Sequence, residues 1–381
     1  MHWLALTLVP GLGPRTSVQL IQRFRSPIAL FRASPSELEA CGVPGSIARS
    51  IASGCTFDDA AGQRDKMMAC GAEIITISGP RYPEKLREIY DPPLLLFARG
   101  DVSLLGSVML AVVGTRHPTQ YGMTVTERMA TELAGAGLTI VSGMARGIDT
   151  AAHKGALAAT GRTVAVFGCG VDLVYPTENR RLAEQIAAKG LVLSEFPLGT
   201  PAYPQNFPIR NRIVSGMCSG TLVVEGAEYS GSAITARLAM EQNREVFAIP
   251  GNITSKMSWA PNLLIKEGAH LVMSPENVMD ALPLGDRSRL AAQRNLFGEE
   301  THPSEGTPGP KDAAAGLGPR AGVARAVLEA LTVDAPIHLD DLLLKVENYS
   351  STEVIGILFE LELLGVVRQL PGRNFVKVWV E

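Results

Sequence analysis

Short apolar runs alternate with amphipathic stretches through the middle of the chain. Seven of these runs, from about residue 110 onward, are LAVVGT, LTIVSG, TVAVFG, LVLSEF, TLVVEG, EVFAIPG and AHLVM. They are apolar on both faces of an extended strand, and a helical pattern follows most of them. This alternation predicts a parallel sheet with helices on both faces, that is, a doubly wound, extended Rossmann-like α/β domain. Two earlier runs, AEIITISG and PPLLLFARGD, predict strands that extend this sheet or form its entrance.

The first 65 residues have a different pattern, with short helical segments interrupted by Pro and Gly. The stretches VPGLGPRTSVQLIQRF and ACGVPGSIARSIASG resemble the helix-hairpin-helix motif, whose turn amides can meet a phosphate. A small helical packing module of the SAM type explains the pattern equally well. We therefore predict a helical domain over residues 1–65 without placing DNA contacts on it, and an α/β domain over residues 66–285.

The pattern weakens again after the α/β region. Residues 286–320 include EETHPSEGTPGPKDAAAGLGPR, which is rich in Pro, Gly, Ser and Glu, and such a segment predicts a flexible linker. Residues 321–381 then show three helical patterns and a hairpin, which resembles a winged helix. The stretch STEVIGILFELELLG, at the position of a recognition helix, carries Glu353, Glu360 and Glu362 but no Lys or Arg. Because groove-binding helices need basic or amide side chains, we expect an accessory or protein-interaction role for this domain.

Composition narrows the class of protein. The 381 residues exceed what one core usually holds, so two or three domains are expected. Hydrophobic residues make up 46% and charged residues 19% of the chain, and the formal net charge is −3. This balance argues mildly against a general polyanion binder, although net charge describes the average surface and not one pocket.

The cysteines and the amino terminus bear on the cellular compartment. The five cysteines are odd in number and form no CxxC pair, which supports neither a disulfide framework nor a zinc site. The opening stretch MHWLALTLVPGLG lacks a basic start and is interrupted by Pro10 and Gly11, so it predicts neither a signal peptide nor a spanning helix. We expect a cytoplasmic protein without a membrane partner.

Polar insertions follow five of the central runs, at the carboxyl ends of the predicted strands. Loops at these ends converge on a crevice where the strand order reverses, so the five insertions predict one site. The basic residues on these loops are Arg116, Arg146, Lys154, Arg180, Arg181, Arg210, Arg212 and Arg237, and aromatic residues are interleaved with them. Guanidinium groups beside aromatic rings suit phosphates with exposed bases between them, although each residue taken singly fits an ordinary surface or packing role.

The turn between TLVVEG and the next helix contains three closely spaced hydroxyl residues, Ser230, Ser232 and Thr235. Backbone amides at a helix start lack intrahelical partners, and the helix dipole is positive there, so this turn predicts an anion site. An ordinary helix cap is the alternative, and it would be the better explanation for an isolated Ser-Gly-Ser turn.

Signatures of nucleotide enzymes are weak in this chain. There is no GxxxxGK[ST] motif, and GCGVDL lacks the third glycine of a dinucleotide fingerprint. Cys169 with His153 would suit a nucleophile with its base, and Asp149 with Asp172 would suit a Mg²⁺ site. A loop-filling role explains Cys169 better, and helix caps explain the other residues better. We predict no catalytic residue, no metal and no cofactor.

Four long motifs carry a family resemblance: SGMARGIDTAAHKGAL, GCGVDLVYPTENRRL, SEFPLGTPAYPQNFPIRNRIVSG and VVEGAEYSGSAITARLAMEQNREVFAIPGN. Together, over about residues 94–279, they resemble the DNA processing protein family DprA, also called Smf. The resemblance implies a dimeric single-stranded DNA binder of natural transformation that protects incoming DNA and loads the RecA recombinase, with a single-stranded DNA-binding protein as a further partner. By motif it implies DNA contacts from Arg116, Ser142, Gly143, Met144, Arg146, Gly147, Phe207, Arg210, Asn211, Arg212, Ser230, Gly231, Ser232 and Thr235.

Two further expectations follow from the same region. Fold relatives that cleave nucleotide monophosphates carry a glutamate in the Gly-rich turn, whereas this chain reads SGSAITARLAM there. We therefore expect a binding protein without turnover, with a nucleotide-monophosphate-cleaving enzyme as the alternative. Ile253, Leu263 and Ile265 lie beyond the last strands and are candidates for a dimer interface, although each also fits a core position.

Overall fold

The computed structural model describes residues 1–228, 230–296, 320–333, 335–363 and 366–378. Residues 1–118 and 126–294 form one compact unit, and the C-terminal residues belong to another.

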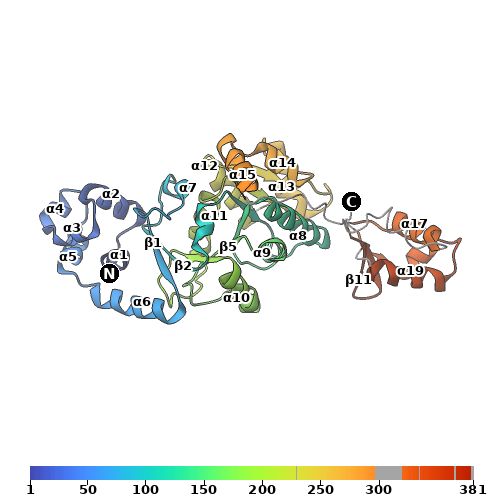
Figure 1. Ribbon diagram of the computed structural model, residues 1–381, viewed down its shortest axis with the longest axis horizontal. Coiled ribbons are helices and arrows are strands. Elements are labelled where there is room, and N and C mark those ends of the chain that lie inside the picture. Colours follow the sequence, from blue (N-terminus) through green and yellow to red (C-terminus); the bar gives the residue numbers. More distant parts are fainter. Residues whose placement is uncertain (229, 297–319, 334, 364–365, 379–381) are drawn as a thin grey trace. The chain divides into compact units, whose positions relative to one another are not determined.

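Short helices form the amino-terminal part, drawn in blue in Figure 1. They are α1 (His2–Thr7), α2 (Pro14–Phe24), α3 (Pro27–Arg32), α4 (Pro35–Glu39), α5 (Gly45–Ser53) and α6 (Phe57–Cys70). Proline occupies the first helical position of α2, α3 and α4, where a missing N–H costs nothing. Ser34 and Glu37 form a reciprocal capping box on α4. Local sequence therefore defines where these helices begin.

A nine-stranded sheet is the centre of the first unit in the described part of the chain. Its strands are β1 (Glu73–Thr76), β2 (Leu95–Gly100), β3 (Met109–Val113), β4 (Thr139–Ser142), β5 (Thr163–Val166), β6 (Leu191–Ser194), β7 (Gly220–Val223), β8 (Glu245–Ala248) and β9 (His270–Leu271). The order is β1-β2-β6-β5-β4-β3-β7-β8-β9. Strands β3 to β9 pair in parallel, as the seven apolar runs predict, whereas β1 and β2 extend the sheet in antiparallel pairing.

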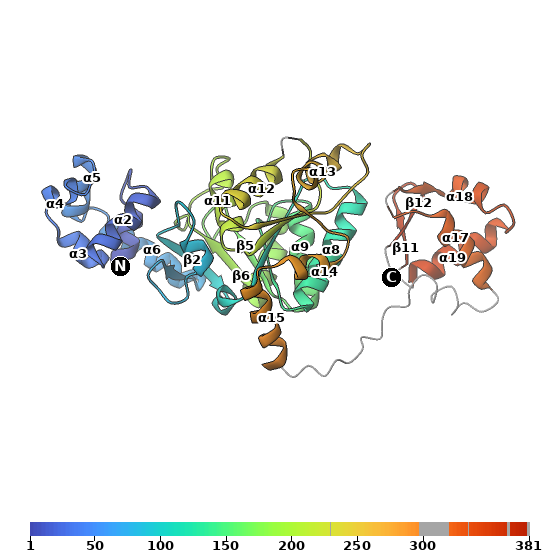
Figure 2. The same cartoon turned by 90° about the horizontal axis from the view of Figure 1, so that it is seen from above.

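Helices connect the strands and cover the sheet. They are α7 (Glu84–Arg87), η1 (Val102–Gly106), α8 (Gln120–Gly135), α9 (Ile148–Ala159), η2 (Thr177–Asn179), α10 (Arg180–Lys189), α11 (Asn206–Gly216), α12 (Gly231–Glu241), η3 (Lys256–Ser258), α13 (Trp259–Lys266), α14 (Pro275–Ala281) and α15 (Leu284–Leu296). Figure 2 shows α11, α12 and α13 on one face of the sheet and α9 on the other. The doubly wound α/β prediction is confirmed.

The strand order reverses between β3 and β7. From β3 the chain winds outward through β4, β5 and β6, and it then returns to place β7 on the other side of β3. Right-handed crossovers require the helices of these two halves to lie on opposite faces, so the loops after β3 and β7 diverge and leave a crevice. The fold thus positions a site at the carboxyl ends of these two strands.

One apolar core joins the amino-terminal helices to the sheet. Leu20, Leu38 and Ile51 from the helices belong to the same buried cluster as Leu96 of β2 and Leu193 of β6. The helices therefore pack on the β1–β2 side of the α/β domain within the first unit.

The C-terminal unit has its own core and a winged-helix layout. It contains α17 (Ala321–Ala330), β10 (Ile337–His338), α18 (Leu339–Lys345), α19 (Ser351–Leu363), β11 (Val367–Leu370) and β12 (Asn374–Lys377). The three strands pair antiparallel in the order β10-β12-β11, and a separate buried cluster lies beneath them. The sequence prediction of three helices and a hairpin is confirmed, with β10 as an additional short strand.

Helix α15 covers the first residues of the predicted linker. Asp286 is buried and pairs with Lys85 at 3.1 Å. This charged pair anchors the start of α15 against the α/β domain. Most of the predicted linker, residues 297–319, lies outside the described residues. Helix α6 likewise continues past residue 65, where we placed the first domain boundary.

Candidate nucleic-acid interface

A cavity of about 410 Å³ opens at the switch point between β3 and β7. The loops after β3, β4 and β7 form its walls together with one side of α11. Most of the predicted DNA-contact residues line it: Arg116, Gly143, Phe207, Arg210, Asn211, Ser230, Gly231, Ser232 and Thr235. The fold therefore brings together residues that are far apart in the sequence, such as Arg116 and Thr235.

The start of α12 forms one wall. Ser230 is the N-cap, and its Oγ accepts a hydrogen bond from the Ala233 amide. The Ser230 and Ser232 hydroxyls bond to each other at 2.8 Å, and Thr235 Oγ1 donates to the Gly231 carbonyl. The helix-cap alternative is thus correct for Ser230. The cap does not exclude an anion, because a single side chain satisfies only one of the free amides of the first turn.

The loop after β4 is held by Asp149 at the start of α9. Its Oδ2 accepts hydrogen bonds from the Gly143 and Ala145 amides at 3.1 and 3.2 Å. Burial raises the pKa of Asp149, while the positive charge of Arg210 opposes that shift. Asp149 therefore shapes the loop and places a buried carboxyl group behind the cavity.

Arg210 on α11 is the deepest cation of the cavity. Its side chain is buried, and Nη1 donates to the Val166 carbonyl at 2.7 Å. Gly143 makes room for it, because a Cβ at position 143 would lie 1.9 Å from Arg210 Nη1. Arg210 Nε has no hydrogen-bond partner among the described residues, and burial lowers the pKa of this guanidinium. An anion in the cavity would restore the solvation that burial removes.

Arg116 supplies the second cation at the cavity rim. It is exposed, and none of the ion pairs among the residues described involves it. Its guanidinium carbon lies 5.8 Å from the centroid of the Phe207 ring, within cation–π range. Phe207 in turn lies 5.5 Å from the Tyr175 ring. A cation and two aromatic rings therefore follow one another outward from the cavity, with Tyr175 in the lining of a neighbouring one.

Three predicted contact residues build the walls without lining the cavity. The Ser142 hydroxyl is buried and donates to the Val112 carbonyl, and the Met144 side chain is fully buried. Gly147 has φ of +72°, and a Cβ there would lie 2.5 Å from the Thr115 carbonyl oxygen. Gly147 thus allows the loops after β3 and β4 to touch. These positions support the cavity through packing, and because the Ser142 and Met144 side chains are buried, the predicted DNA contacts there would have to come from the backbone.

Two predicted arginines point elsewhere. Arg212 is buried and ion-paired with Asp91 at 3.1 Å and with Glu195 at 2.5 Å, and it lines a different cavity. Two carboxylates pair with it, which gives Arg212 a structural role, and the phosphate contact expected there stays a prediction. Arg146 is exposed and forms a two-pronged pair with Glu178 outside the switch-point cavity.

Sequence reasoning missed other lining residues. Thr115 and His117 flank Arg116 in the same loop and line the cavity, and Asp149 lies at its back. Because Thr115 and His117 are the sequence neighbours of Arg116, their position in the chain could have predicted that they line the cavity. The loop hydrogen bonds of Asp149 come from residues four and six positions away, which only the folded loop reveals.

The candidate catalytic residues do not assemble. His153 is fully buried against Thr163, and burial raises the pKa of the Cys169 thiol to about 11. Among the described residues no group of three or more His, Cys, Asp or Glu side chains could hold a metal ion.

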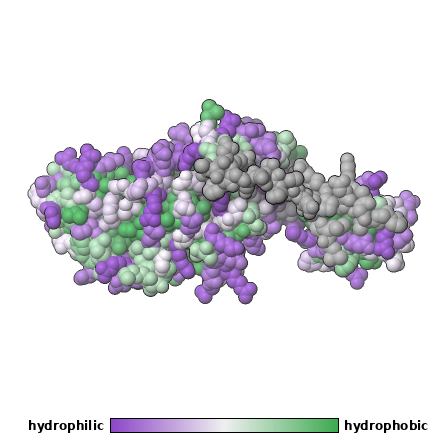
Figure 3. Space-filling view, viewed as in Figure 1, coloured by the Kyte–Doolittle hydropathy of each residue, from purple (hydrophilic) through white to green (hydrophobic). Residues whose placement is uncertain are grey.

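No helix in the described part of the chain is long and apolar enough to cross a membrane. Figure 3 shows hydrophilic and apolar residues interspersed on the face in view.

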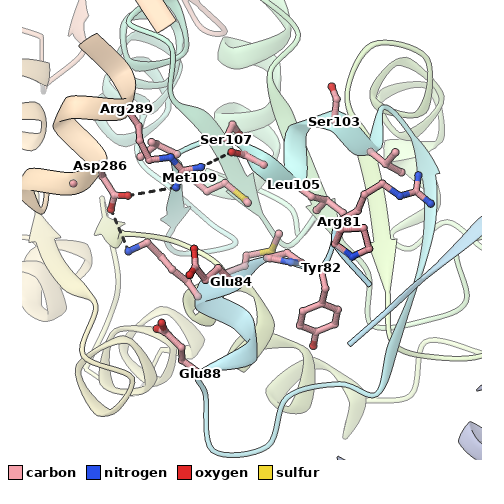
Figure 4. Close-up of a pocket in the computed structure, with 18 residues that line it drawn as sticks. Arg81, Tyr82, Glu84, Glu88, Ser103, Leu105, Ser107, Met109, Asp286 and Arg289 are labelled. Carbon is pink, nitrogen blue, oxygen red and sulfur yellow. Dashed lines mark hydrogen bonds and ion pairs between the residues drawn. The ribbon is translucent and has the colours of Figure 1, made fainter. Parts of the chain in front are cut away.

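A second cavity, of about 580 Å³, lies at the start of β3 and therefore at the opposite end of that strand from the first cavity (Figure 4). Figure 4 shows Asp286 and Arg289 of α15 side by side. Asp286 pairs with Lys85 at 3.1 Å, and Arg289 Nη2 donates to the Gly106 carbonyl at 2.6 Å. Glu84 and Glu88 also line this cavity. Carboxylates and cations are mixed there, so it lacks the excess of positive charge that an anion site needs.

The dimer candidates differ in exposure. Ile253 is 91% exposed in the segment after β8. Leu263 and Ile265 lie on α13, where both are partly buried and Ile265 packs against the main core. Ile253 is therefore the most available of the three for a contact with a second copy.

Comparison with known proteins agrees with this architecture. Residues 73–283 match the family model of DNA recombination-mediator protein A, and residues 310–373 match the DprA winged helix domain. DNA processing protein DprA of Bacillus subtilis is 44% identical over 214 residues, which cover 56% of this chain and 72% of that protein.

Two solved structures are also similar. DprA of Streptococcus pneumoniae aligns with a TM-score of 0.67 and 34% identity, covering 74% of this chain and 98% of that one. A Helicobacter pylori structure, described by its single-stranded DNA binding mode, aligns with a TM-score of 0.50 and 31% identity over 55% of this chain and 94% of its own. With its α/β domain and its winged helix both matched, the chain belongs to the DprA/Smf family of DNA processing proteins.

Proposed function

We propose that the switch-point cavity holds a backbone phosphate of single-stranded DNA. The observation that carries the proposal is the convergence of Arg116, Arg210 and the amide end of α12 on one cavity. Two guanidinium groups and a helix start are the donors that bind phosphate most effectively. The single-stranded DNA binding of the H. pylori relative supports the same assignment.

Phe207 and Tyr175 extend the proposal from the phosphate to its neighbouring base. Rings beside a phosphate site stack on unpaired bases with little sequence preference. A duplex cannot offer such a base without the free-energy cost of opening, so single strands should bind more tightly than duplex.

The family role completes the proposal. We infer that the protein acts in the cytoplasm during natural transformation, where it protects incoming single strands and loads RecA onto them. A homodimer and contact with a single-stranded DNA-binding protein belong to the same proposal. The description of the matched family as a recombination mediator supports it.

Light scattering tests the proposed dimer. Ile253→Asp should lower the molecular mass that light scattering measures, whereas a monomeric parent protein would refute the dimer.

The test is a titration by fluorescence anisotropy with mixed-sequence single strands and duplex at several salt concentrations. Each phosphate contact should contribute about 0.7 to the log–log salt slope. Arg116→Ala should lower the affinity for all sequences alike and flatten the slope by about one such contact. Arg146→Ala is the matched control, because Arg146 is also exposed but lies outside the cavity and pairs with Glu178. Equal losses in the two variants would refute the site.

The same preparations distinguish a binding protein from a nucleotide-cleaving enzyme. Asp149 is the only carboxylate among the described residues that line the cavity, and two amides already occupy its Oδ2. We therefore expect no multiple-turnover release of base or phosphate from nucleoside monophosphates, NAD or ATP, with or without Mg²⁺. Steady release that Asp149→Asn abolishes would establish the enzyme instead.

A further inference from the structure

A further cavity, of about 560 Å³, lies beside the loop after β5 and the start of α10, and we call it the β5-loop cavity. Its floor is apolar, because Phe167, Val171 and Val192 line it and are at most 3% exposed. Leu173 and Tyr175 line it nearer the solvent, where they are 38% and 45% exposed. The cavity therefore offers an apolar surface to a group that enters from the solvent.

The charged side chains of the β5-loop cavity balance one another. Arg99 and Arg180 line it together with Asp172 and Glu184, so two cations stand beside two carboxylates. Neither arginine forms an ion pair among the residues that the structure describes, so both guanidinium groups keep donors for a ligand. Asp172 Oδ1 accepts a hydrogen bond from the Gly199 amide at 2.9 Å. These donors and acceptors suit the polar edge of a neutral group better than a phosphate.

The β5-loop cavity adjoins the switch-point cavity. Phe207 lines the switch-point cavity, Tyr175 lines the β5-loop cavity, and their ring centroids lie 5.5 Å apart. A Cβ at Gly168 would lie 2.9 Å from the Phe207 ring, whereas its neighbours Phe167 and Cys169 line the β5-loop cavity. The same stretch of backbone therefore borders both cavities. The 5.5 Å between the rings is less than two steps of a stacked strand, at about 3.4 Å each.

We propose that the β5-loop cavity takes up one unpaired base of the bound single strand. This proposal rests on the proposed function, because a phosphate in the switch-point cavity must first hold the strand. A base has two apolar faces, a polar edge with donors and acceptors, and no charge, so it matches the apolar floor and the balanced charges. A second phosphate is disfavoured because the carboxylates would repel it. An apolar side chain of a partner protein is disfavoured because it would leave the four charged side chains without a partner.

The test compares a mixed-sequence single strand with the same sugar–phosphate strand made of abasic sites, by fluorescence anisotropy with the full-length protein. The abasic strand should bind the parent about tenfold more weakly or worse, because stacked bases contribute to affinity. Leu173→Ser removes part of the apolar wall, and Ala202→Trp fills the cavity that Ala202 lines. Each should weaken binding of the natural strand about fivefold or more and leave binding of the abasic strand unchanged. Leu284→Ser is the matched control, since Leu284 is 74% exposed on α15 and outside both cavities.

The salt dependence separates this proposal from the phosphate site. Leu173→Ser should keep the log–log salt slope of the parent, because the loss of a base contact releases no counterion, whereas Arg116→Ala flattens the slope. Three results would overturn the base cavity: equal affinity of the parent for the two strands, natural-strand affinity in both cavity variants equal to that of the parent, and equal losses for the two strands in those variants. If Arg116→Ala still flattens the slope, the phosphate site stands without the base cavity. An unchanged slope in Arg116→Ala would refute both. Thermal melting confirms that each variant is folded.

Discussion

Gly143 gives the guanidinium of Arg210 its place in the cavity. A methyl group at position 143 would lie 1.9 Å from Nη1, so Gly143→Ala must displace the arginine. We expect the affinity for single strands to fall about tenfold, which corresponds to about 1.4 kcal/mol. Fluorescence anisotropy measures the change.

Gly231→Ala is the matched control for Gly143→Ala. Gly231 lines the same cavity, but a Cβ there would meet nothing within 4 Å. Single-strand affinity should therefore stay close to that of the parent. If both alanine variants bind as the parent does, Arg210 does not hold the phosphate.

His153 predicts a pH-dependent stability. Thr163 Oγ1 donates to the Ile140 carbonyl and lies 2.7 Å from His153 Nδ1, so Nδ1 carries the proton and Nε2 is bare. Burial is the main cause that lowers the pKa of His153 to about 3, whereas an unfolded histidine titrates near 6.5. The unfolded state therefore binds the proton first as the pH falls. The free energy of unfolding should decrease by about 2 kcal/mol from pH 7 to pH 5.

Urea unfolding at the two pH values measures this decrease, and His153→Gln supplies the comparison. The glutamine lacks a group that titrates in this range, whereas every other ionisable group is shared by the two proteins. Its unfolding free energy should therefore change less with pH. Identical pH dependence in the parent and the variant would show that His153 does not make this contribution.

At the scale of elements, the start of α12 offers a substitution with opposite effects on stability and binding. Gly231 is exposed in the first turn, and its surroundings are open. Gly231→Asp should stabilise the helix by about 0.3–1 kcal/mol through the helix dipole. The same carboxylate would repel a phosphate at the free amides, so we expect single-strand affinity to fall at least tenfold.

Thermal melting and anisotropy measure the two effects of Gly231→Asp, and Gly231→Ala controls for the loss of glycine. We prefer position 231 to Ser232, which is 4% exposed and would bury a new charge. A variant that is more stable and binds DNA as well as the parent would exclude the start of α12 from the site.

For the whole molecule, the α/β unit should bind DNA without the C-terminal unit, provided that α15 is kept. Asp286 and Arg289 attach α15 to Lys85 and to the Gly106 carbonyl (Figure 4). A chain ending at residue 296 should keep most of the single-strand affinity. A chain ending at residue 285 should unfold at lower temperature, because Lys85 then loses its buried partner.

Anisotropy and melting of the two truncated chains test this division. The acidic α19 motivates it, since a helix without Lys or Arg offers no cation to a phosphate. A folded 1–296 chain without affinity for single strands would place essential DNA contacts in the C-terminal unit.

The sequence by itself determined the strands and much of the domain layout. A strand apolar on both faces can be stable only inside a sheet covered on both sides, so the seven runs define a parallel sheet before any contact is known. Helix starts such as Ser230 are equally local, because an N-cap bonds within its own turn. The prediction of an anion site after β7 follows from these two signals, since it needs only the end of a strand and the start of a helix.

Only the tertiary structure decided which basic side chains serve the cavity. Arg210 and Arg212 stand two positions apart in one motif, yet on α11 that spacing turns them about 200° from each other. One guanidinium reaches the cavity beside Gly143, and the other is buried between Asp91 and Glu195. Their roles depend on what lies on each side of the helix. Those neighbours come from distant parts of the chain, which no local pattern specifies.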